Sequence, residues 1–345
     1  MATIIDVAKL AGVGIGSVSR VINGKGSVSE KTKQKINNAI EALNYKPNNS
    51  ARSLVSKKFN TIGIWGTELA GTFNSQTLRV IDHELINHGK HCLVTNGDIS
   101  SKDNPNAAIQ SVDDLISKGC DGIIFWGTDI SNYDITYIEK YFPNIVLLNN
   151  NIQQIDEKCF YFDHYRAGYM AGQHLVDNGH KSIACITGDL KTEDGRQRHQ
   201  GFLDSLNDNA VAISPEYIVE GDYSFLKGRQ SILDLLKRDL GFSAVFCGND
   251  KTAMAAISTL VINQIRVPED ISIVGYDDYD MAAFTSPSLT TIRVPFDDMA
   301  LAAVRYLLNN LYDLNLTIKH NFQVELIQRN SVKNINRSPF PPYIV

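Results

Sequence analysis

The sequence has few of the patterns by which enzymes, metalloproteins and exported proteins are recognised. It contains no Walker sequence, no nucleophile elbow and no pair of histidines at metal-ligand spacing. Neither an apolar segment after Met1 nor an uncharged run as long as a membrane span is present. The five cysteines are odd in number and scattered, which favours reduced thiols: Cys92, Cys120, Cys159, Cys185 and Cys247. We therefore expect an intracellular protein without cofactor or metal.

Positive charge is also scarce, except at the start of the chain. The net charge of the 345 residues is −5. Residues 1–58 hold ten lysines and arginines against three acidic residues, whereas the remainder holds 23 basic and 35 acidic residues. A basic segment joined to an acidic body indicates that only the first segment meets a polyanion such as DNA.

Three glycines near the start of the chain, Gly12-x-Gly14-x-Gly16, allow two interpretations. A dinucleotide-binding loop has a similar spacing, but it requires a buried strand before the glycines. Here the apolar residues from Ile4 to Ala11 recur with the helical period, and Thr3 with Asp6 resembles a helix cap. A helix therefore enters this turn, and Gly12 is expected to end it in a left-handed conformation.

Two more short helices are expected after this turn. Val13, Val18, Val21 and Ile22 give a second apolar face, and Ser29 precedes a third amphipathic segment that ends near Leu43. Three short helices with a glycine turn between the first two predict a helix-turn-helix unit. After Pro47, residues 51–56 would make only about two helical turns, so this linker is expected to order only when something packs on it.

From residue 60 onward, apolar strand patterns alternate with helical patterns. The expected strands are Ile62–Trp65, His91–Thr95, Gly122–Trp126, Ile145–Leu148, Ser182–Ile186, Ala244–Cys247 and Ile271–Val274. The expected helices between them include Thr77–Asn87, Ala107–Lys118, Arg166–Asn178 and Thr252–Asn263. This alternation predicts two parallel sheets flanked by helices, over about 60–161 and 163–290. Ligands of such sheets bind beyond the carboxyl ends of the strands.

Polar residues follow several of these strands. They are Asn149–Asn151, Thr192–Arg198, Asn249–Asp250 and Asp277–Asp278. Carboxylates and amides suit hydrogen bonding to hydroxyl groups, while Phe73, Trp126 or Phe296 could stack on an apolar sugar face. Any one of these polar residues is as well explained by a turn or a helix cap, and His180 is expected to be structural. Their convergence favours a binding site.

Several segments, in order along the chain, resemble one family. They are Thr3-Ile-Ile-Asp-Val-Ala-Lys-Leu-Ala-Gly-Val13, Ser17-Val-Ser-Arg-Val-Ile-Asn23, Val28-Ser29, Leu43-Asn-Tyr-Lys-Pro-Asn48, Asp177–Ala184, Gly248-Asn-Asp250, Val267–Asp278, Leu289–Ile292 and Arg329-Asn-Ser331. With these segments the chain strongly resembles the lactose/galactose repressor (LacI/GalR) family of bacterial transcription regulators. The resemblance covers nearly the whole chain except its C-terminal tail.

The resemblance implies an organisation in four parts. They are an all-α helix-turn-helix DNA-binding head (1–46), a hinge helix or linker (47–59), an α/β body like a periplasmic binding protein (60–336) and a tail (337–345). The body would have two parallel-sheet subdomains, one combining 60–161 with 294–321 and the other 163–291 with 323–336. The tail shows no leucine heptads, so a helical tetramerising extension is not expected.

The resemblance also implies a set of DNA contacts. Base edges would be read by Ile15, Gly16 and Arg20, and Leu54 of the hinge would be a wedge in the minor groove. The full expected set is Thr3, Ile15, Gly16, Ser17, Ser19, Arg20, Asn23, Ser29, Thr32, Asn48, Ala51 and Leu54. Gly14 and Gly16 depart from the family pattern, which has a serine cap and a side chain there. Each interior glycine costs about 0.5–1 kcal/mol of helix stability, so we expect a weakened recognition helix.

In the body, the resemblance implies an effector site for a small molecule. The expected contacts are Phe73, Trp126, Asn149, Asn150, Arg198, Asn249, Asp277 and Phe296. An arginine, an aspartate and several amides suit a small sugar or sugar phosphate better than a purine. The loop Ala70–Asn74 lacks the Asp-Pro-Phe-Phe of galactose-type members.

These observations predict a cytoplasmic, nucleoid-associated bacterial regulator and not an enzyme. It would be a homodimeric repressor of a carbohydrate-utilisation operon that binds palindromic operator DNA under the control of a sugar. Two other classes remain in view. A soluble sugar-binding receptor would share the body but has no use for residues 1–58, and a nicotinamide-dependent enzyme would need a strand before Gly12.

Overall fold

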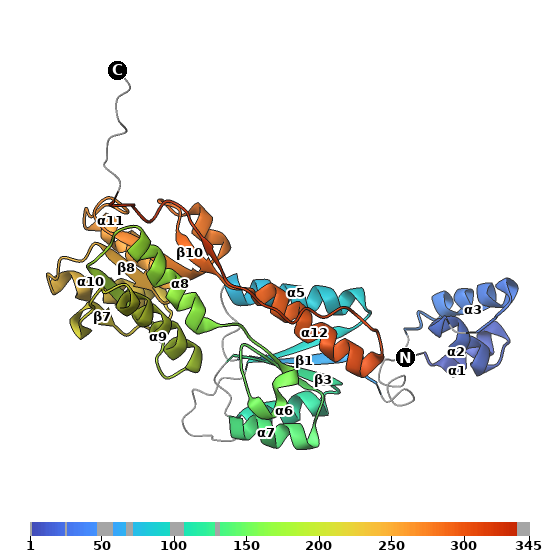
Figure 1. Ribbon diagram of the computed structural model, residues 1–345. Coiled ribbons are helices and arrows are strands. Elements are labelled where there is room, and N and C mark those ends of the chain that lie inside the picture. The colour runs from blue at the N-terminus through green and yellow to red at the C-terminus, as the bar shows by residue number, and fades with distance from the viewer. Residues whose placement is uncertain are drawn as a thin grey trace. The chain divides into compact units, whose positions relative to one another are not determined.

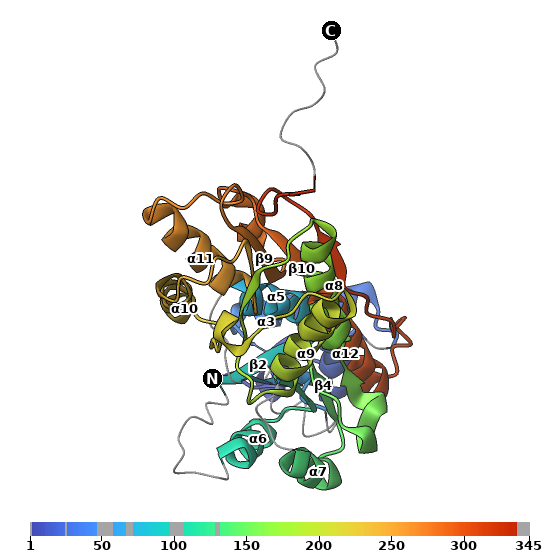
Figure 2. The same ribbon diagram turned by 60° about the vertical axis from the view of Figure 1, so that its left-hand side comes forward.

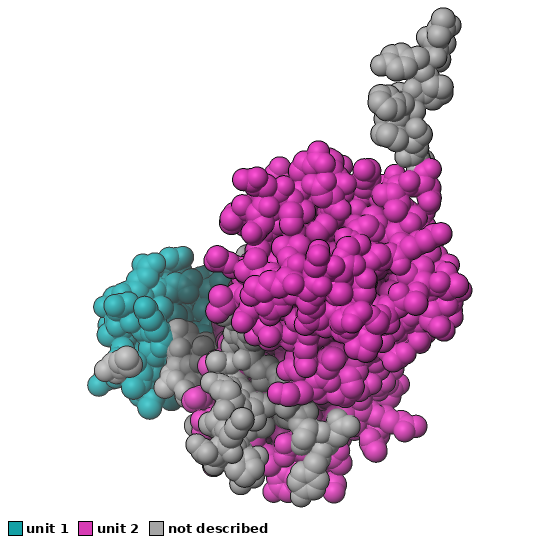
Figure 3. Space-filling view, turned by 90° about the vertical axis from the view of Figure 1, so that its left-hand side faces the viewer, with its two compact units in different colours: residues 1–59 teal, residues 60–345 magenta. Residues whose placement is uncertain are grey.

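The computed structural model describes residues 2–24, 26–46, 58–66, 72–96, 107–127 and 132–336. The chain forms two compact units, a head (Met1–Phe59) and a body (Asn60–Val345), shown in different colours in Figure 3. Within the described residues no helix is long and apolar enough to cross a membrane.

The described part of the head contains three helices, α1 (Ile4–Ala11), α2 (Ile15–Asn23) and α3 (Glu30–Ala42). Local signals in the sequence set their bounds. Thr3 caps α1 in a capping box with Asp6, and Gly12 ends it in the left-handed conformation, as predicted. The small core contains the buried residues Val7, Ala8, Ala11, Val18, Ile36 and Ala39.

The first sheet of the body is parallel, in the order β2-β1-β3-β4-β5. Its strands are β1 (Thr61–Gly66), β2 (His91–Asn96), β3 (Gly122–Trp126), β4 (Ile145–Leu148) and β5 (Cys159–Phe160). Helices α5 (Thr72–Asn87) and α12 (Phe296–Tyr312) lie on one face, and α6 (Ala107–Ser117) and α7 (Asn132–Tyr141) on the other (Figure 1). Both faces of β3 and β4 are buried, which explains their uninterrupted apolar sequences.

The second sheet has the order β11-β10-β9-β8-β6-β7. Its strands are β6 (Ile183–Ile186), β7 (Ile218–Val219), β8 (Ala244–Cys247), β9 (Ser272–Asp277), β10 (Thr290–Arg293) and the antiparallel β11 (Glu325–Ile327). Helices α8 (His164–Asp177) and α9 (Glu193–Asp208) lie on one face, and α10 (Phe225–Lys237) and α11 (Asp250–Ile262) on the other (Figure 2). Short 3-10 helices occur at η1 (Gln153–Lys158), η2 (Pro215–Tyr217) and η3 (Asp280–Phe284).

The chain passes between the two sheets three times, between β5 and α8, between β10 and α12, and between α12 and β11. His164, just after the first crossing, contacts both Asn149 after β4 and Tyr276 of β9, so the carboxyl ends of these two strands face a common region. Helices α8 and α9 pack closely there, since a Cβ on Gly168 would collide with the backbone oxygen of Arg198. This contact fixes the position of Arg198 beside the crossings.

The two parallel-dominated sheets agree with the predicted fold class, and the differences lie at element ends. Strand β9 runs to Asp277, three residues beyond the predicted end, because its pairing with β10 continues to Arg293. Helix α5 begins at Thr72 and not at Thr77. The predicted second sheet also ended at residue 290, whereas β10 and β11 extend it to Ile327. His180 is structural, as predicted, with its ring bonded to Ser243 and the backbone of Lys333.

Candidate functional site

Helix α2 of the head presents one face to its core and the other to solvent. Val18 is fully buried, whereas Ile15 is 47% exposed and Gly16 and Arg20 are also exposed. The three residues expected to read base edges are therefore all accessible on α2. Gly14 caps α2 without a side-chain hydrogen bond, and the helix still forms and ends at Gly24 in the left-handed conformation.

Two of the hydroxyl residues expected to contact DNA, Thr3 and Ser29, lie at the beginnings of helices. Thr3 caps α1, and Ser29 caps α3 by accepting from the backbone of Thr32. Free backbone N–H groups and the helix dipole make such ends favourable for anions. Ser17 and Ser19 are half-buried on α2. Asn23 ends α2, but its side chain lies outside what is described, and so do residues Asn48, Ala51 and Leu54.

In the body, Arg198 of α9 is the central charge beyond the carboxyl ends of the second sheet. Its side chain is 6% exposed, its Nη1 donates to the backbone oxygen of Gly248, and its Nη2 lies 3.4 Å from Asp194 Oδ2. The guanidinium also lies 3.6 Å from the ring centre of Tyr276. Burial opposes its charge, but the Tyr223 and Tyr276 rings and nearby carboxylates raise the pKa of Arg198, so it stays protonated.

Asp194 completes this ion pair. Burial opposes ionisation of its carboxyl group, but the charge of Arg198 together with hydrogen bonds from Thr192 and the Gly195 backbone outweighs that effect and lowers the pKa of Asp194. Arg198 Nε and Asp194 Oδ1 are both buried and have no hydrogen-bond partner among the described residues. One is a donor and the other an acceptor, so the pair leaves one bond of each kind unsatisfied.

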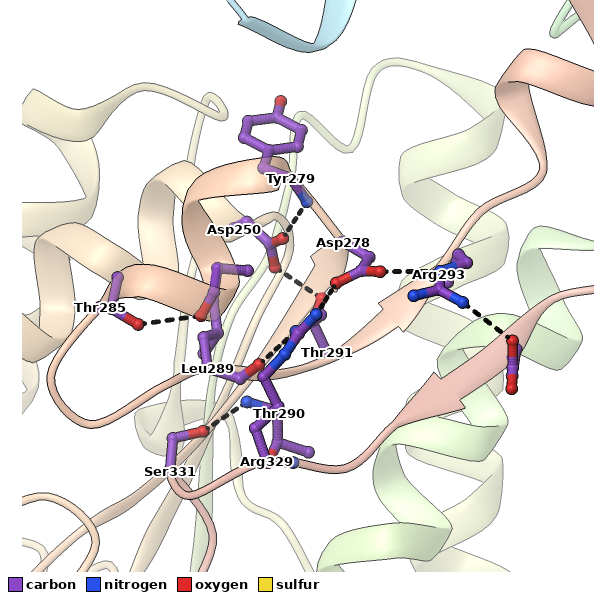
Figure 4. Close-up of polar contacts among 12 residues, drawn as sticks. Asp250, Asp278, Tyr279, Thr285, Leu289, Thr290, Thr291, Arg293, Arg329 and Ser331 are labelled. Carbon is purple, nitrogen blue, oxygen red and sulfur yellow. Dashed lines mark hydrogen bonds and ion pairs between the residues drawn. The ribbon is translucent and has the colours of Figure 1, made fainter.

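Asp277 ends β9 next to this pair with a positive φ of 113°. Burial raises the pKa of Asp277 to about 7, although Arg198 acts in the opposite direction. The following residue, Asp278, has a φ of 61° and binds two arginines, Arg293 Nε at 2.8 Å and Arg329 Nη2 at 2.6 Å (Figure 4). These ion pairs hold the unusual backbone at the end of β9 in place.

Asp250 supports the same strand end from α11. Figure 4 shows its buried carboxyl group, which accepts from Thr291 Oγ1 at 2.6 Å and from the backbone N–H of Tyr279 at 2.8 Å. Burial raises the pKa of Asp250 well above its usual range. The neighbouring Asn249 caps α11 by accepting from Thr252 and donates its amide to the backbone oxygen of Tyr223. Asn249, which we predicted as an effector contact, therefore also caps a helix.

A hydrogen-bond chain links the two sheets through His164, the first residue of α8. Its Nε2 lies 2.8 Å from Asn149 Oδ1, and its Nδ1 lies 2.9 Å from Tyr276 Oη. Burial lowers the pKa of His164 to about 3, so the ring is neutral. A neutral ring that donates to the Asn149 oxygen must accept from Tyr276 at its other nitrogen. Asn149, after β4, is thus connected to Tyr276 of β9.

Aromatic side chains line the same region. Phe296 is 7% exposed and packs edge-on against Phe162, with ring centres 5.8 Å apart. Phe162 in turn lies 4.1 Å from the ring centre of His164. Trp126, at the end of β3, is 7% exposed and belongs to the main hydrophobic core. Phe73 lies in α5, but its side chain is not described.

The structure thus brings Asn149, Arg198, Asn249, Asp277 and Phe296 to one region, which we call the cleft. Two grooves contain some of these residues in their linings, and neither lining includes Arg198 or Asn249. Asn149 and Asn150 line the larger one, of about 1480 Å³, and Asp277 and Phe296 line the smaller one, of about 340 Å³. Sequence reasoning did not single out Asp194, His164 and Tyr276. Asp194 does lie within the polar segment predicted after β6, but the other two carry no local signal.

Comparison with known proteins gives a family match in each of the two units. Residues 3–48 match the model of bacterial regulatory proteins of the lacI family, and residues 173–332 match a periplasmic binding protein-like domain. The transcriptional regulator GalR of Escherichia coli is 31% identical over 333 residues, covering 96% of each chain. The chain belongs to the LacI family. The repressor PurR of Histophilus somni is 32% identical, covering 97% of this chain and 100% of that protein.

A solved LacI-family structure has the same architecture. The lac repressor dimer bound to operator and the anti-inducer ONPF superposes with a TM-score of 0.84 at 28% identity, covering 96% of this chain and 99% of that one. Membership of the LacI family makes this protein a DNA-binding transcriptional regulator with a ligand-binding body, and its relatives are regulators and not enzymes.

Proposed function

We propose that this LacI-family regulator represses a carbohydrate-utilisation operon and responds to a small sugar bound in the cleft. The observation that carries the proposal is the buried Arg198–Asp194 pair, whose unpartnered Nε and Oδ1 offer one donor and one acceptor. A sugar hydroxyl can accept from the first and donate to the second. Asp277 and Asn149 offer further hydrogen bonds, and Phe296 an apolar face.

The head would bind a palindromic operator in the cytoplasm, at the bacterial nucleoid. Arg20 would donate to a guanine and Ile15 would contact a thymine methyl group in the major groove, while the ends of α1 and α3 hold phosphates. The exposure of Ile15, Gly16 and Arg20 on α2 supports this assignment. Leu54 of the hinge would wedge into the minor groove, as the family resemblance implies.

The working form would be a homodimer, since a palindrome presents two equal half-sites. Large apolar side chains are exposed on three elements of the second subdomain, α10, α11 and η3, where a second copy would cover them. They are Phe225, Leu226, Val261, Ile262, Met281 and Phe284, with exposed fractions from 52% to 81%.

Control would arise from linkage between the cleft and the head. A sugar that draws the two sheets together changes the angle between the subdomains, and the chain crosses between them three times. In a dimer this change would alter the separation of the two hinges around Leu54. Operator affinity would change by the coupling free energy, about 1–3 kcal/mol in typical cases.

The proposal is tested by fluorescence anisotropy with a library of palindromic operators, across salt concentrations and with a panel of sugars. Sequence-selective binding that weakens steeply with salt and shifts with one sugar is the expected result. Sugar binding without any selective DNA binding would instead favour a soluble sugar receptor. Selective DNA binding that no sugar affects would show that the cleft has been assigned to the wrong ligand.

A further inference from the structure

The body begins at Asn60, whose backbone and side chain are both held by hydrogen bonds. Its backbone N–H donates to Asp121 Oδ2 at 2.6 Å, and its side-chain oxygen accepts from Lys90 Nζ at 2.6 Å. Its backbone oxygen accepts from the N–H of His91 at 2.9 Å. The φ of Asn60 is 57°, a conformation that asparagine adopts more readily than most residues. Groups at the starts of β2 and β3 therefore fix the direction in which the chain enters β1.

Tyr312, the last residue of α12, joins the same group. Its hydroxyl donates to Asp121 Oδ2 at 2.6 Å, the oxygen atom that also accepts from Asn60. Lys90 Nζ lies 3.5 Å from the centre of the Tyr312 ring, within the range of a cation–π interaction. Burial and the Asp121 carboxylate raise the pKa of Tyr312, so its hydroxyl stays protonated and remains a donor. We call Asn60, Lys90, Asp121 and Tyr312 the linker anchor, and all four residues are half-buried.

Helix α12 connects the linker anchor with the cleft. Phe296, which lies in the cleft, is the first residue of this helix and Tyr312 is the last, so about 25 Å of helix separates them. No glycine or proline interrupts the helix, and its buried side chains pack on the first sheet beside α5 (Figure 1). Near its end the packing is tight, since a Cβ on Gly122 of β3 would lie 3.0 Å from the side chain of Leu311. A displacement of one end of such a helix is carried to the other end.

The linker, residues 47–59, directly precedes Asn60 in the sequence. We expect its residues 51–56 to make about two helical turns, which are marginal in isolation. Whether so short a helix forms depends on how its two ends are held. The linker anchor holds the point at which the linker joins the body, and the same point is bonded to the end of α12.

We propose that the linker anchor is a positioning device for operator binding. It sets the direction in which the linker leaves the body, and Tyr312 makes that direction depend on the position of α12 and thus on the cleft. This inference rests on the linkage between cleft and head proposed above and names the residues that carry it. The four residues act on DNA affinity through the linker. Loss of the Tyr312 hydroxyl should therefore uncouple the two binding sites without abolishing either.

The test is Tyr312→Phe in the full-length protein, which keeps the ring beside Lys90 and removes the bond to Asp121. The DNA probe is the palindrome that the wild-type protein binds most tightly in a randomised library, and the ligand probes are glucose, galactose, fructose, sucrose and cellobiose. Operator affinity, measured by anisotropy, should fall by about 2- to 30-fold. The factor by which a bound sugar changes operator affinity should move toward one. Affinity for non-specific DNA, and sugar affinity measured by calorimetry without DNA, should stay unchanged.

These measurements distinguish positioning from a loss of stability. If Tyr312 only stabilised the fold, Tyr312→Phe would lower the denaturant midpoint of the body and leave the operator affinity of the folded protein as it is. Tyr169→Phe is the matched control, because Tyr169 is half-buried in the second subdomain and its hydroxyl also donates to an aspartate, Asp208 Oδ2 at 3.1 Å.

A double-mutant cycle tests whether Tyr312 acts through Asp121. Asp121→Asn weakens the same bond from the other side, so each single variant should lower operator affinity. Because both changes act on one bond, the loss in the double variant should be smaller than the product of the two single losses. A full product would show that the two residues act independently and would contradict the role of their bond.

The outcomes separate the inference from the function on which it rests. Wild-type operator affinity and a wild-type sugar response in Tyr312→Phe would overturn the inference, and so would an equal change in Tyr169→Phe. If the wild-type protein bound no palindrome selectively, the proposed function would fail and the inference with it. If it bound one but responded to none of the sugars, the sugar part of the proposed function would fail, and the operator affinities of the variants would still decide the positioning role.

Discussion

The head and the body of this protein present charge in opposite ways. In the head, Arg20 is exposed on α2 and the core beneath it is small. In the body, Arg198 is 6% exposed, and Asp194, Gly248 and Tyr276 surround it. A polyanion such as DNA brings its own charge to a solvated arginine, whereas a small sugar requires polar groups that are withdrawn from water and paired beforehand.

This difference predicts that a substitution of an exposed head residue changes DNA affinity without changing folding stability. A substitution in the cleft should change ligand affinity and folding stability together. Both tryptophans of the chain, Trp65 and Trp126, are buried in the body. Tryptophan fluorescence therefore reports unfolding of the body alone, and hydrogen exchange of residues 2–46 reports on the head.

The largest effect is expected for Arg198→Met. Removal of the guanidinium leaves Asp194 buried without its partner, which costs about 3–5 kcal/mol of body stability, and it removes the central sugar donor. We expect a lower denaturant midpoint of tryptophan fluorescence and no measurable sugar binding. The double variant Asp194→Leu/Arg198→Met should recover much of the stability and none of the binding. Recovery of sugar binding in the double variant would contradict the role of the pair.

Arg20→Ala should change binding without changing stability. Loss of one base contact costs about 1–3 kcal/mol, or roughly 5- to 150-fold in operator affinity. Sugar affinity and the fluorescence midpoint should stay as they are. Lys9→Gln, an exposed basic residue on α1, is the control and should shift operator affinity only slightly. Equal losses in both variants would show that α2 does not read bases.

Sugar binding should depend on pH through Asp277. Its pKa is raised to about 7, so the ionised form that accepts hydroxyl groups is populated only near and above neutral pH. Sugar affinity should rise by up to about tenfold per pH unit below 7 and level off above it. Because the pKa of Asp277 is higher in the folded body than in the unfolded chain, the unliganded folded body binds more protons between pH 4 and 7. The contribution of Asp277 to the stability of the body is therefore lost as pH rises through 7. Asp277→Asn should remove the pH dependence of sugar affinity and of body stability. If both pH profiles stayed the same in this variant, a group other than Asp277 would cause them.

The smallest effects concern glycines of the head. A Cβ at Gly16 would meet no atom within 4 Å, so Gly16→Ala should stabilise α2 by about 0.5–1 kcal/mol. Gly12→Ala should instead destabilise the head, because the positive φ of 65° at this position strains any residue with a side chain. Slower hydrogen exchange over residues 15–23 in the first variant and faster exchange in the second are expected. Equal responses would mean that backbone conformation does not limit the head.

The secondary structure could be predicted where its signals are local. The period and caps of α1 lie within ten residues, and the buried strands β3, β4 and β8 coincide with their apolar runs. Strand β11 could not be predicted, because Glu325–Ile327 is a short, partly exposed segment defined only by its pairing with β10.

The candidate site could be predicted only in part, because some of its residues are defined by contacts between distant segments of the chain. Arg198, Asn249 and Asp277 follow strands or begin helices, where the fold class itself directs attention. His164 and Tyr276 acquire their roles from contacts that span more than one hundred residues of sequence. Asp194 lies four residues before Arg198 on α9, so its pairing with Arg198 is local, but its burial depends on the folded chain.

The most direct test of the account measures linkage in both directions on one sample. Operator affinity is measured by anisotropy with and without a saturating sugar, and sugar affinity by calorimetry with and without saturating operator. We predict the same factor in both, within the 5- to 150-fold range of a typical coupling free energy. Two tight but independent binding events would contradict the central claim that the cleft controls the head.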